Sequence, residues 1–166
     1  TDPMRLRFIV KQYSDHISVP IVLENGKEKE TLNSSSALWM RPKADITEEQ
    51  YRDFYRALTH NFDEPWLTLH YKAEGIIEYN ALLFIPSKAP FDMFQPDKKH
   101  GLNLYVNRVF ISNEVEELLP HYLRFVQGVI DTTELPLNVS REMLQHTPVL
   151  GKIKKGIVTR ILEEMK

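Results

Sequence analysis

The sequence contains no cysteine among its 166 residues. Disulfides, zinc–thiolate sites and thiol nucleophiles are therefore excluded, and a reducing compartment is compatible with this composition. The six glycines do not form the spaced pattern of a phosphate-binding loop. No apolar run approaches the roughly 18 residues of a membrane-spanning helix, and the N-terminal residues lack the apolar core of a signal peptide. We therefore expect a cytoplasmic location without a membrane partner.

A strong charge of either sign is also missing. Lysine and arginine number 21 against 23 acidic residues, which gives a net charge of -2. A general nucleic-acid binder needs a basic face to neutralise phosphates, so nucleic acid is not an expected partner. The six histidines lack the spacing of a metal site, and no metal is expected. No nucleophile elbow or recognisable carboxylate pair is present, so a stand-alone enzyme is weakly supported.

Apolar residues make up 42% of the chain and charged residues 27%, which is typical of one globular domain. The order of the predicted elements indicates an α/β or α+β fold, with a mixed sheet against which helices pack. Strong local signals are the hairpin dipeptide Asn25-Gly26 and the helix caps Thr47 and Thr147. Helices are predicted over 3–14, 47–60, 120–130 and from 147 onward, and strands over 19–24, 27–32, 65–73, 76–85 and 102–112.

Residues 131–145 are predicted to be a connection between two helices, but they are long for one and too apolar for a solvated loop. Ser140 can cap a short helix that begins at Arg141. An arginine held there suits a negatively charged ligand such as phosphate. Residue types alone favour the alternative that Arg141 forms a structural ion pair with a nearby carboxylate. The apolar residues expected to be buried in this segment are Leu135, Leu137, Val139, Met143 and Leu144.

Two further apolar segments leave alternatives open. Trp39 precedes a proline-bounded loop and could be exposed or could close the sheet as a core residue. Phe91, Met93 and Phe94 lie in a segment broken by two prolines. These three side chains either pack under the domain, which the residue types favour, or form an adaptable surface.

Five collinear segments resemble the middle domain of the ninety-kilodalton heat-shock chaperone family, called HtpG in bacteria. The resemblance runs from Arg5 to the C-terminus, and its most specific part is the eleven-residue run at 135–145. The segments are 37–42 (ALWMRP), 46–51 (ITEEQY), 84–94 (FIPSKAPFDMF), 104–111 (LYVNRVFI) and 135–145 (LPLNVSREMLQ).

The resemblance implies an α+β fold like the second domain of ribosomal protein S5, with a mostly antiparallel sheet sandwiched by helices. It divides the chain into a large αβα subdomain over 1–146, with a catalytic loop at 131–145, and the start of a connecting helical segment at 147–166. The family's middle region continues into a smaller subdomain, so this chain resembles its larger first part.

The resemblance also implies a function. In the family, the N-terminal domain binds ATP with magnesium, and the middle domain contributes an arginine to the γ-phosphate when the two domains dock. Arg141 matches that arginine and Gln145 matches a second residue of the same loop, which Asn138 and Ser140 help to shape. This chain alone should not hydrolyse ATP. The family's client-contacting residues correspond to Trp39, Phe91, Met93, Phe94 and Phe110.

The partners that the resemblance implies are the protein's own N-terminal ATPase domain, unfolded or partly folded client proteins, and the bacterial seventy-kilodalton chaperone system. A homodimer is implied through a C-terminal domain that lies outside this sequence. Asn107 departs from the family, which often carries a basic residue there. The alternative function is a non-catalytic interaction scaffold in which Arg141 has a structural role.

Overall fold

The computed structural model describes residues 2–91, 93–95 and 101–166, and for Arg141 it describes the backbone alone. A five-stranded sheet forms the centre of the molecule, in the order β3-β4-β7-β5-β6. Every neighbouring pair is antiparallel except β5 and β7, which are parallel. The strands are β3 (Pro65–Ala73), β4 (Tyr79–Pro86), β5 (Gly101–Val106), β6 (Val109–Ser112) and β7 (Gln127–Thr132).

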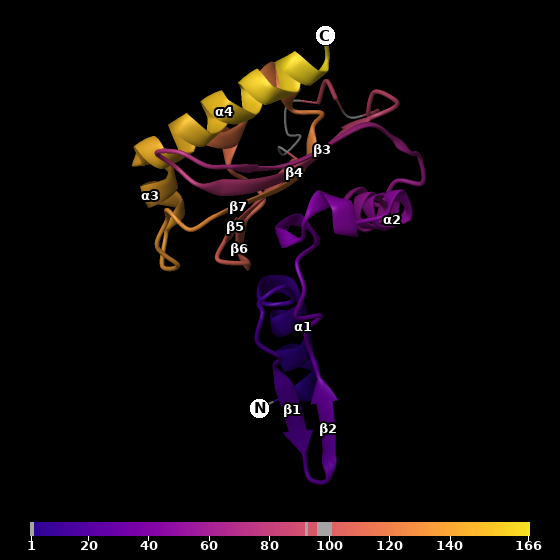
Figure 1. The fold of residues 1–166 in the computed structure, drawn as a ribbon. Helices are drawn as coiled ribbons and strands as arrows, with labels where there is room; N and C mark the ends of the chain where they lie inside the picture. The colour runs from indigo at the N-terminus through magenta and orange to yellow at the C-terminus, as the bar shows by residue number, and fades with distance from the viewer. Residues whose placement is uncertain (1, 92, 96–100) are drawn as a thin grey trace.

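Helices cover both faces of this sheet (Figure 1). Helix α2 (Glu48–Thr59) lies on one face, where Tyr55 packs against Phe84 of β4. The opposite face is covered by α3 (Arg141–His146) and α4 (Pro148–Glu164). The apolar stripe of α4 that enters this second core consists of Leu150, Ile153, Ile157 and Ile161, all fully buried. The α+β fold, with a mixed and mostly antiparallel sheet between helical layers, is confirmed.

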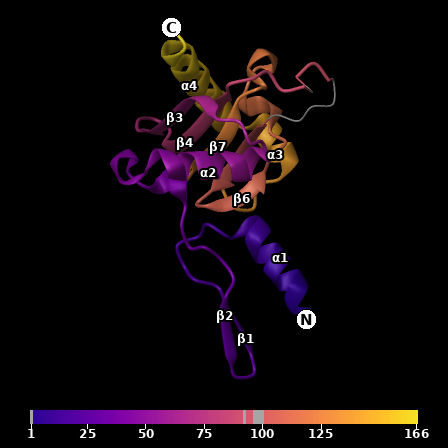
Figure 2. The same cartoon turned by 90° about the vertical axis from the view of Figure 1, so that its right-hand side faces the viewer.

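The N-terminal part extends away from the sheet (Figures 1 and 2). It consists of α1 (Pro3–Tyr13) and the hairpin of β1 (Val22–Asn25) and β2 (Glu28–Thr31), which form a separate two-stranded sheet. No residue of α1 is buried. An exposed ion pair of 2.7 Å joins Arg7 to Glu30 of the hairpin. Contact with the main body is made by Tyr13, whose ring centroid lies 6.0 Å from that of Phe110.

The helix N-caps predicted from the sequence are confirmed. Thr47 and Gln50 form a capping box at the start of α2, with each side chain accepting from the other residue's amide. Ser140 caps α3 by accepting from the amide of Met143, and Thr147 caps α4. Short 3-10 helices occupy Leu38–Met40, Lys43–Asp45, Glu116–Leu118 and His121–Leu123.

The helix predicted over 120–130 is wrong, because a 3-10 turn at His121–Leu123 is followed by the central strand β7. β7 is buried on both faces, and a short, fully buried apolar run has no periodicity that separates a strand from a helix. Gly128 was a residue in the sequence that could have indicated a strand closely approached by a neighbouring backbone. A Cβ there would lie 2.3 Å from the carbonyl oxygen of Leu82, so β4 approaches β7 closely at this position.

Candidate functional site

The connection after β7 is shorter than predicted and is anchored to the core. Asp131 and Thr132 are the last residues of β7, and α3 begins at residue 141, so the irregular part spans 133–140. Leu135 is 5% exposed and packs in the core below α4, and Val139 packs against the same cluster. A turn closes between them, since the amide of Val139 donates to the carbonyl of Pro136 at 3.2 Å. These contacts hold the segment in one place on the sheet.

The expectation that all five apolar residues of this segment are buried is wrong for two of them. Leu144 is 3% exposed, but Leu137 is 56% and Met143 47% exposed. The polar residues Asn138, Ser140 and Gln145 also face solvent. The segment therefore presents a mixed apolar and polar surface on a base held by buried leucines.

Arg141 is the first residue of α3, as the sequence predicted. The position of its side chain lies outside the part of the molecule that the structure describes, and the phosphate-binding and ion-pair interpretations of Arg141 stay predictions. Gln145, one turn further on, lines a small cavity of about 220 Å³. The same cavity is bordered by the acidic residues Glu114, Glu116 and Glu117.

A buried carboxylate that the sequence analysis did not single out lies at the start of this segment. Asp131, at the end of β7, is 3% exposed. Its Oδ2 accepts hydrogen bonds from Nε1 of Trp39 at 2.8 Å and from the backbone amide of Arg108 at 3.1 Å. Burial raises the pKa of the Asp131 carboxyl, while these two hydrogen bonds and the nearby Arg108 and His16 charges oppose that rise.

Trp39 is therefore a core residue, which was one of the two alternatives. Its side chain is 1% exposed and packs between His16 and Tyr105, with ring centroids 4.7 and 4.6 Å away. In this conformation the indole does not offer a surface to a client. The client-contacting role that the resemblance implies for Trp39 stays untested.

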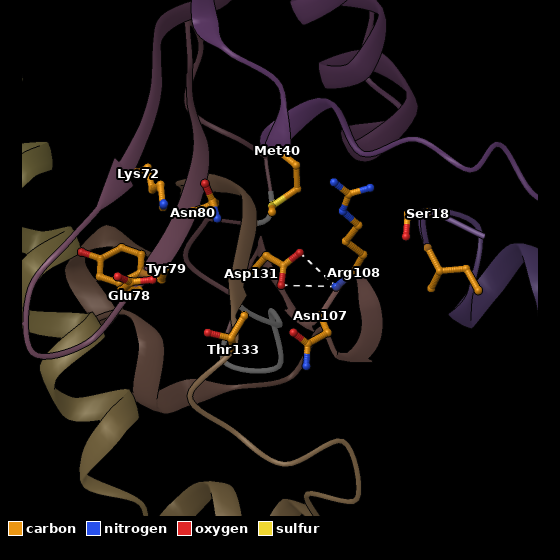
Figure 3. A pocket seen from close by; sticks show the side chains of 11 residues that line it. Ser18, Met40, Lys72, Glu78, Tyr79, Asn80, Asn107, Arg108, Asp131 and Thr133 are labelled. Carbon is orange, nitrogen blue, oxygen red and sulfur yellow. Dashed lines mark hydrogen bonds between the residues drawn. The ribbon is translucent and has the colours of Figure 1, made fainter.

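Asp131 is one of the residues that line an open polar cavity of about 420 Å³ (Figure 3). The cavity lies on the sheet face of α2, where Lys72, Asn80 and Asp131 form a row across β3, β4 and β7. Arg108 extends past Asp131 from the β5–β6 turn (Figure 3). Asn107 and Arg108 form that turn with φ angles of 49° and 65°, as a two-residue hairpin requires. This arrangement can hydrogen-bond a polar group, but it contains no paired nucleophile and base.

His70 lies on the same face, and each of its two ring nitrogens has a hydrogen-bond partner. Its Nε2 is 3.0 Å from the carbonyl oxygen of Trp39, and its Nδ1 is 2.6 Å from the hydroxyl of Tyr51. Since a carbonyl can only accept, Nε2 carries the proton and Nδ1 accepts from Tyr51 in the neutral ring. Burial lowers the pKa of His70, which favours this neutral form. His70 therefore links β3, α2 and the segment before α2.

The predicted client-contacting residues fall into two groups. Phe110 is half-buried against Tyr105, the same ring that packs on Trp39. Phe91 and Phe94 are fully exposed after β4, so the expectation that they pack under the domain is wrong. Met93 is partly buried. Two prolines, Pro86 and Pro90, disfavour a regular strand or helix in this segment.

Phe91 also lines a cavity of about 470 Å³ at the C-terminal end of α2. Phe62, which is 92% exposed, lines the same cavity. The sequence analysis missed Phe62, because one aromatic residue in a polar connection carries no periodic signal.

Within residues 2–91, 93–95 and 101–166, no cluster of three histidine or acidic residues has the geometry to hold a metal ion. No helix in the same part of the chain is long and apolar enough to cross a membrane.

Comparison with known proteins shows extensive similarity. Residues 22–166 match the model of the family described as Hsp90 protein. The chaperone protein HtpG of Paramagnetospirillum magneticum is 63% identical over 166 residues, which cover 99% of this chain and 27% of that protein. HtpG of Rickettsia canadensis is 57% identical and HtpG of Rhodospirillum rubrum 56% identical, each over 99% of this chain. The chain thus spans about a quarter of the length of these curated relatives.

Proposed function

The chain belongs to the Hsp90 family, and from this we propose that it is the large first part of the middle domain of an ATP-dependent chaperone. The similarity to HtpG proteins over nearly the whole chain carries this proposal. In the full protein this part would couple ATP hydrolysis in a separate N-terminal domain to the binding of unfolded client proteins. The cytoplasmic location, the homodimer and the seventy-kilodalton chaperone partner remain predictions.

Arg141 is the residue we propose for the γ-phosphate of ATP bound, with magnesium, in the N-terminal domain. A planar and permanently charged guanidinium can donate two hydrogen bonds to one phosphate. Leu135 and Leu144 hold the backbone on either side of Arg141 against the core, which supports a fixed position for the arginine. Gln145 is exposed on the same short helix and would face the nucleotide side. The isolated chain should not hydrolyse ATP.

The predicted division into 1–146 and 147–166 also remains a proposal. The buried stripe of α4 belongs to the same core as β4 and β7. A connecting role for this helix would therefore be combined with a structural role in the sheet domain.

The Arg141 proposal is tested in the full-length protein with Arg141→Ala. Loss of one such transition-state contact lowers turnover by about 10²- to 10³-fold, while nucleotide affinity should change little because the ATP pocket lies in another domain. Arg160→Ala is a matched control, since Arg160 is a surface arginine paired with Glu164 on α4. Wild-type turnover in Arg141→Ala would refute the role.

The scaffold alternative makes a different prediction for the same variant. If Arg141 is held in a buried ion pair, its removal leaves a carboxylate unpaired and lowers the unfolding free energy by about 3–5 kcal/mol. Urea unfolding of this chain with and without Arg141→Ala distinguishes the two. A large loss of stability with normal turnover in the full-length protein would favour the scaffold.

The proposed client surface is tested at Phe91 and Phe94. Because both rings are exposed, charged substitution should leave the fold intact and weaken binding of an unfolded protein. Ile76→Glu is the matched control, since Ile76 is 88% exposed in the β3–β4 connection. Binding of a permanently unfolded protein to full-length Phe91→Glu and Phe94→Glu should fall, with unchanged circular dichroism. Unchanged binding in both variants would contradict the proposal.

A further inference from the structure

The sheet has one long edge whose backbone is unpaired. β3 spans nine residues. It is the terminal strand on one side of the sheet (Figure 2). Leu67–Ala73 pair in continuous antiparallel register with Ile85–Tyr79 of β4. Among the described residues, the β3 backbone makes hydrogen bonds to β4 and to no other segment. Alternate residues of an edge strand direct their N–H and C=O groups outward, which leaves about three or four such residues on β3.

This edge lacks the protection found elsewhere in the molecule. Pro65 and a register shift interrupt its beginning, and Lys72, paired with Glu74 at 3.0 Å, lies near its end. Between these points, Leu67–Tyr71 carry no charged side chain when His70 is neutral, and burial lowers the pKa of His70. Charged side chains, prolines and short strands are the usual protection of exposed edges.

The other exposed edges differ. The β1–β2 hairpin has strands of four residues each, and its charged side chains include Glu24 and Lys29, which form an ion pair. β6, at the opposite end of the main sheet, is also four residues long and lies beside the end of α1. β3 is therefore the longest edge strand of the described structure, and its residues 67–71 carry no charged side chain when His70 is neutral.

A cavity of about 310 Å³ adjoins this edge on the face of α2. Tyr51 of α2 and Pro65 and Thr68 of β3 line it, and the Arg52–Glu64 ion pair of 3.0 Å stands at its border. An added strand beside β3 would direct alternate side chains toward this face. Lys43 and Glu48 complete a charged border, and the apolar surface inside it comes from the Tyr51 ring and Pro65. One apolar side chain of an added strand could contact these two residues.

We propose that β3 binds an extended segment of an unfolded client polypeptide by β-strand addition, with one apolar side chain in the cavity beside Tyr51. A peptide backbone is the chemistry that offers donors and acceptors at the repeat of a strand edge. The seven paired residues of β3 would accommodate a segment about 23 Å long. The choice of an unfolded client as occupant rests on the proposed chaperone function, whereas the pairing itself rests on the geometry of β3.

The test uses the full-length protein and a fluorescent peptide of alternating valine and threonine, with one lysine and one glutamate at its ends. Two further peptides carry N-methyl groups on alternate residues, one on the odd and one on the even positions. N-methylation removes the amide donors along one edge of the extended peptide and leaves every side chain unchanged. One isomer should bind at least about tenfold more weakly than the parent, because it loses several hydrogen bonds, and the other should bind within about twofold. Equal binding of both isomers overturns the inference.

Amide hydrogen exchange locates the site. At saturating parent peptide, outward amides within Leu67–Ala73 should exchange at least about tenfold more slowly, and those of the β1–β2 hairpin should be unchanged. In the protein, Trp66→Lys adds a charge at the beginning of this edge, where Trp66 is 59% exposed. It should weaken the peptide at least about threefold. Tyr122→Lys is the control, since Tyr122 is 62% exposed outside β3.

The outcomes separate this inference from the proposed function. If an unfolded protein binds and responds to Phe91→Glu without protection of β3, the chaperone proposal stands and the β3 inference fails. If β3 is protected by the peptide but no unfolded protein binds, the proposed function fails and β3 recognises another extended partner. If a higher protein concentration without peptide slows amide exchange in β3, and the protein self-associates through this strand, the partner of β3 is a second copy of the chain. The inference is then wrong.

Discussion

The buried carboxylate of Asp131 gives a prediction whose sign depends on the structure. Asp131→Asn keeps the side-chain shape and removes the titratable group. An asparagine oxygen at the Oδ2 position can still accept from Trp39 at 2.8 Å and from the Arg108 amide at 3.1 Å. Its NH₂ group would then stand where Oδ1 lies, 3.4 Å from the same Arg108 amide. That opposition of two donors costs about 1 kcal/mol near neutral pH, and removal of a buried charge offsets part of it.

The pH dependence follows from the direction of the pKa shift. Burial raises the pKa of Asp131 above its usual value of 3.8 in the folded chain. Between the unfolded and folded pKa values, the folded chain binds a proton that the unfolded chain has released. The unfolding free energy of the wild type therefore falls as pH rises through this interval, by up to about 1.4 kcal/mol per unit of pKa difference. Asp131→Asn lacks this term, so the wild type should gain stability relative to the variant as pH is lowered.

Urea unfolding of the 166-residue chain and its Asp131→Asn variant at several values between about pH 3.5 and 6 measures this difference. Asp53→Asn, on the exposed surface of α2, controls for the loss of a surface carboxylate. A stability difference that instead favours the variant increasingly as pH falls would show that the hydrogen bonds from Trp39 and Arg108 outweigh burial, and would refute the reasoning.

Three further predictions concern the sheet and the loop after it. Gly128→Ala should prevent normal folding, because its Cβ would lie 2.3 Å from the carbonyl oxygen of Leu82; native circular dichroism in this variant would contradict the assigned strand packing. Leu144→Ala should lower the unfolding free energy by about 2–4 kcal/mol through cavity formation, whereas Leu137→Ala, at an exposed position, should change it by less than about 0.5 kcal/mol; urea unfolding compares the two, and equal losses would count against the loop geometry. Ser140→Ala removes the cap of α3 at a cost of about 1 kcal/mol, so the amide of Met143 should exchange faster, and unchanged exchange would argue against the cap.

The features that the sequence by itself determined are those that depend on a few neighbouring residues. The Asn25-Gly26 hairpin and the caps at Thr47 and Ser140 are all present, because turn and cap preferences arise from local backbone geometry. The strand predicted over 76–85 is also present, as β4 at Tyr79–Pro86. The start of α3 at residue 141, and with it the position of Arg141 on the backbone, was also predicted correctly.

Tertiary structure alone decided the features that depend on what covers a residue. β7 was misread as a helix because five buried residues between β4 and β5 have no exposed face to reveal their period. Leu137 and Phe91 are apolar yet exposed, and residue type alone does not show which apolar residues of a loop meet the core. The hydrogen bond between Trp39 and Asp131 joins residues 92 positions apart, and no local pattern encodes such a contact. The open edge of β3 likewise follows from strand order, which sequence periodicity does not specify.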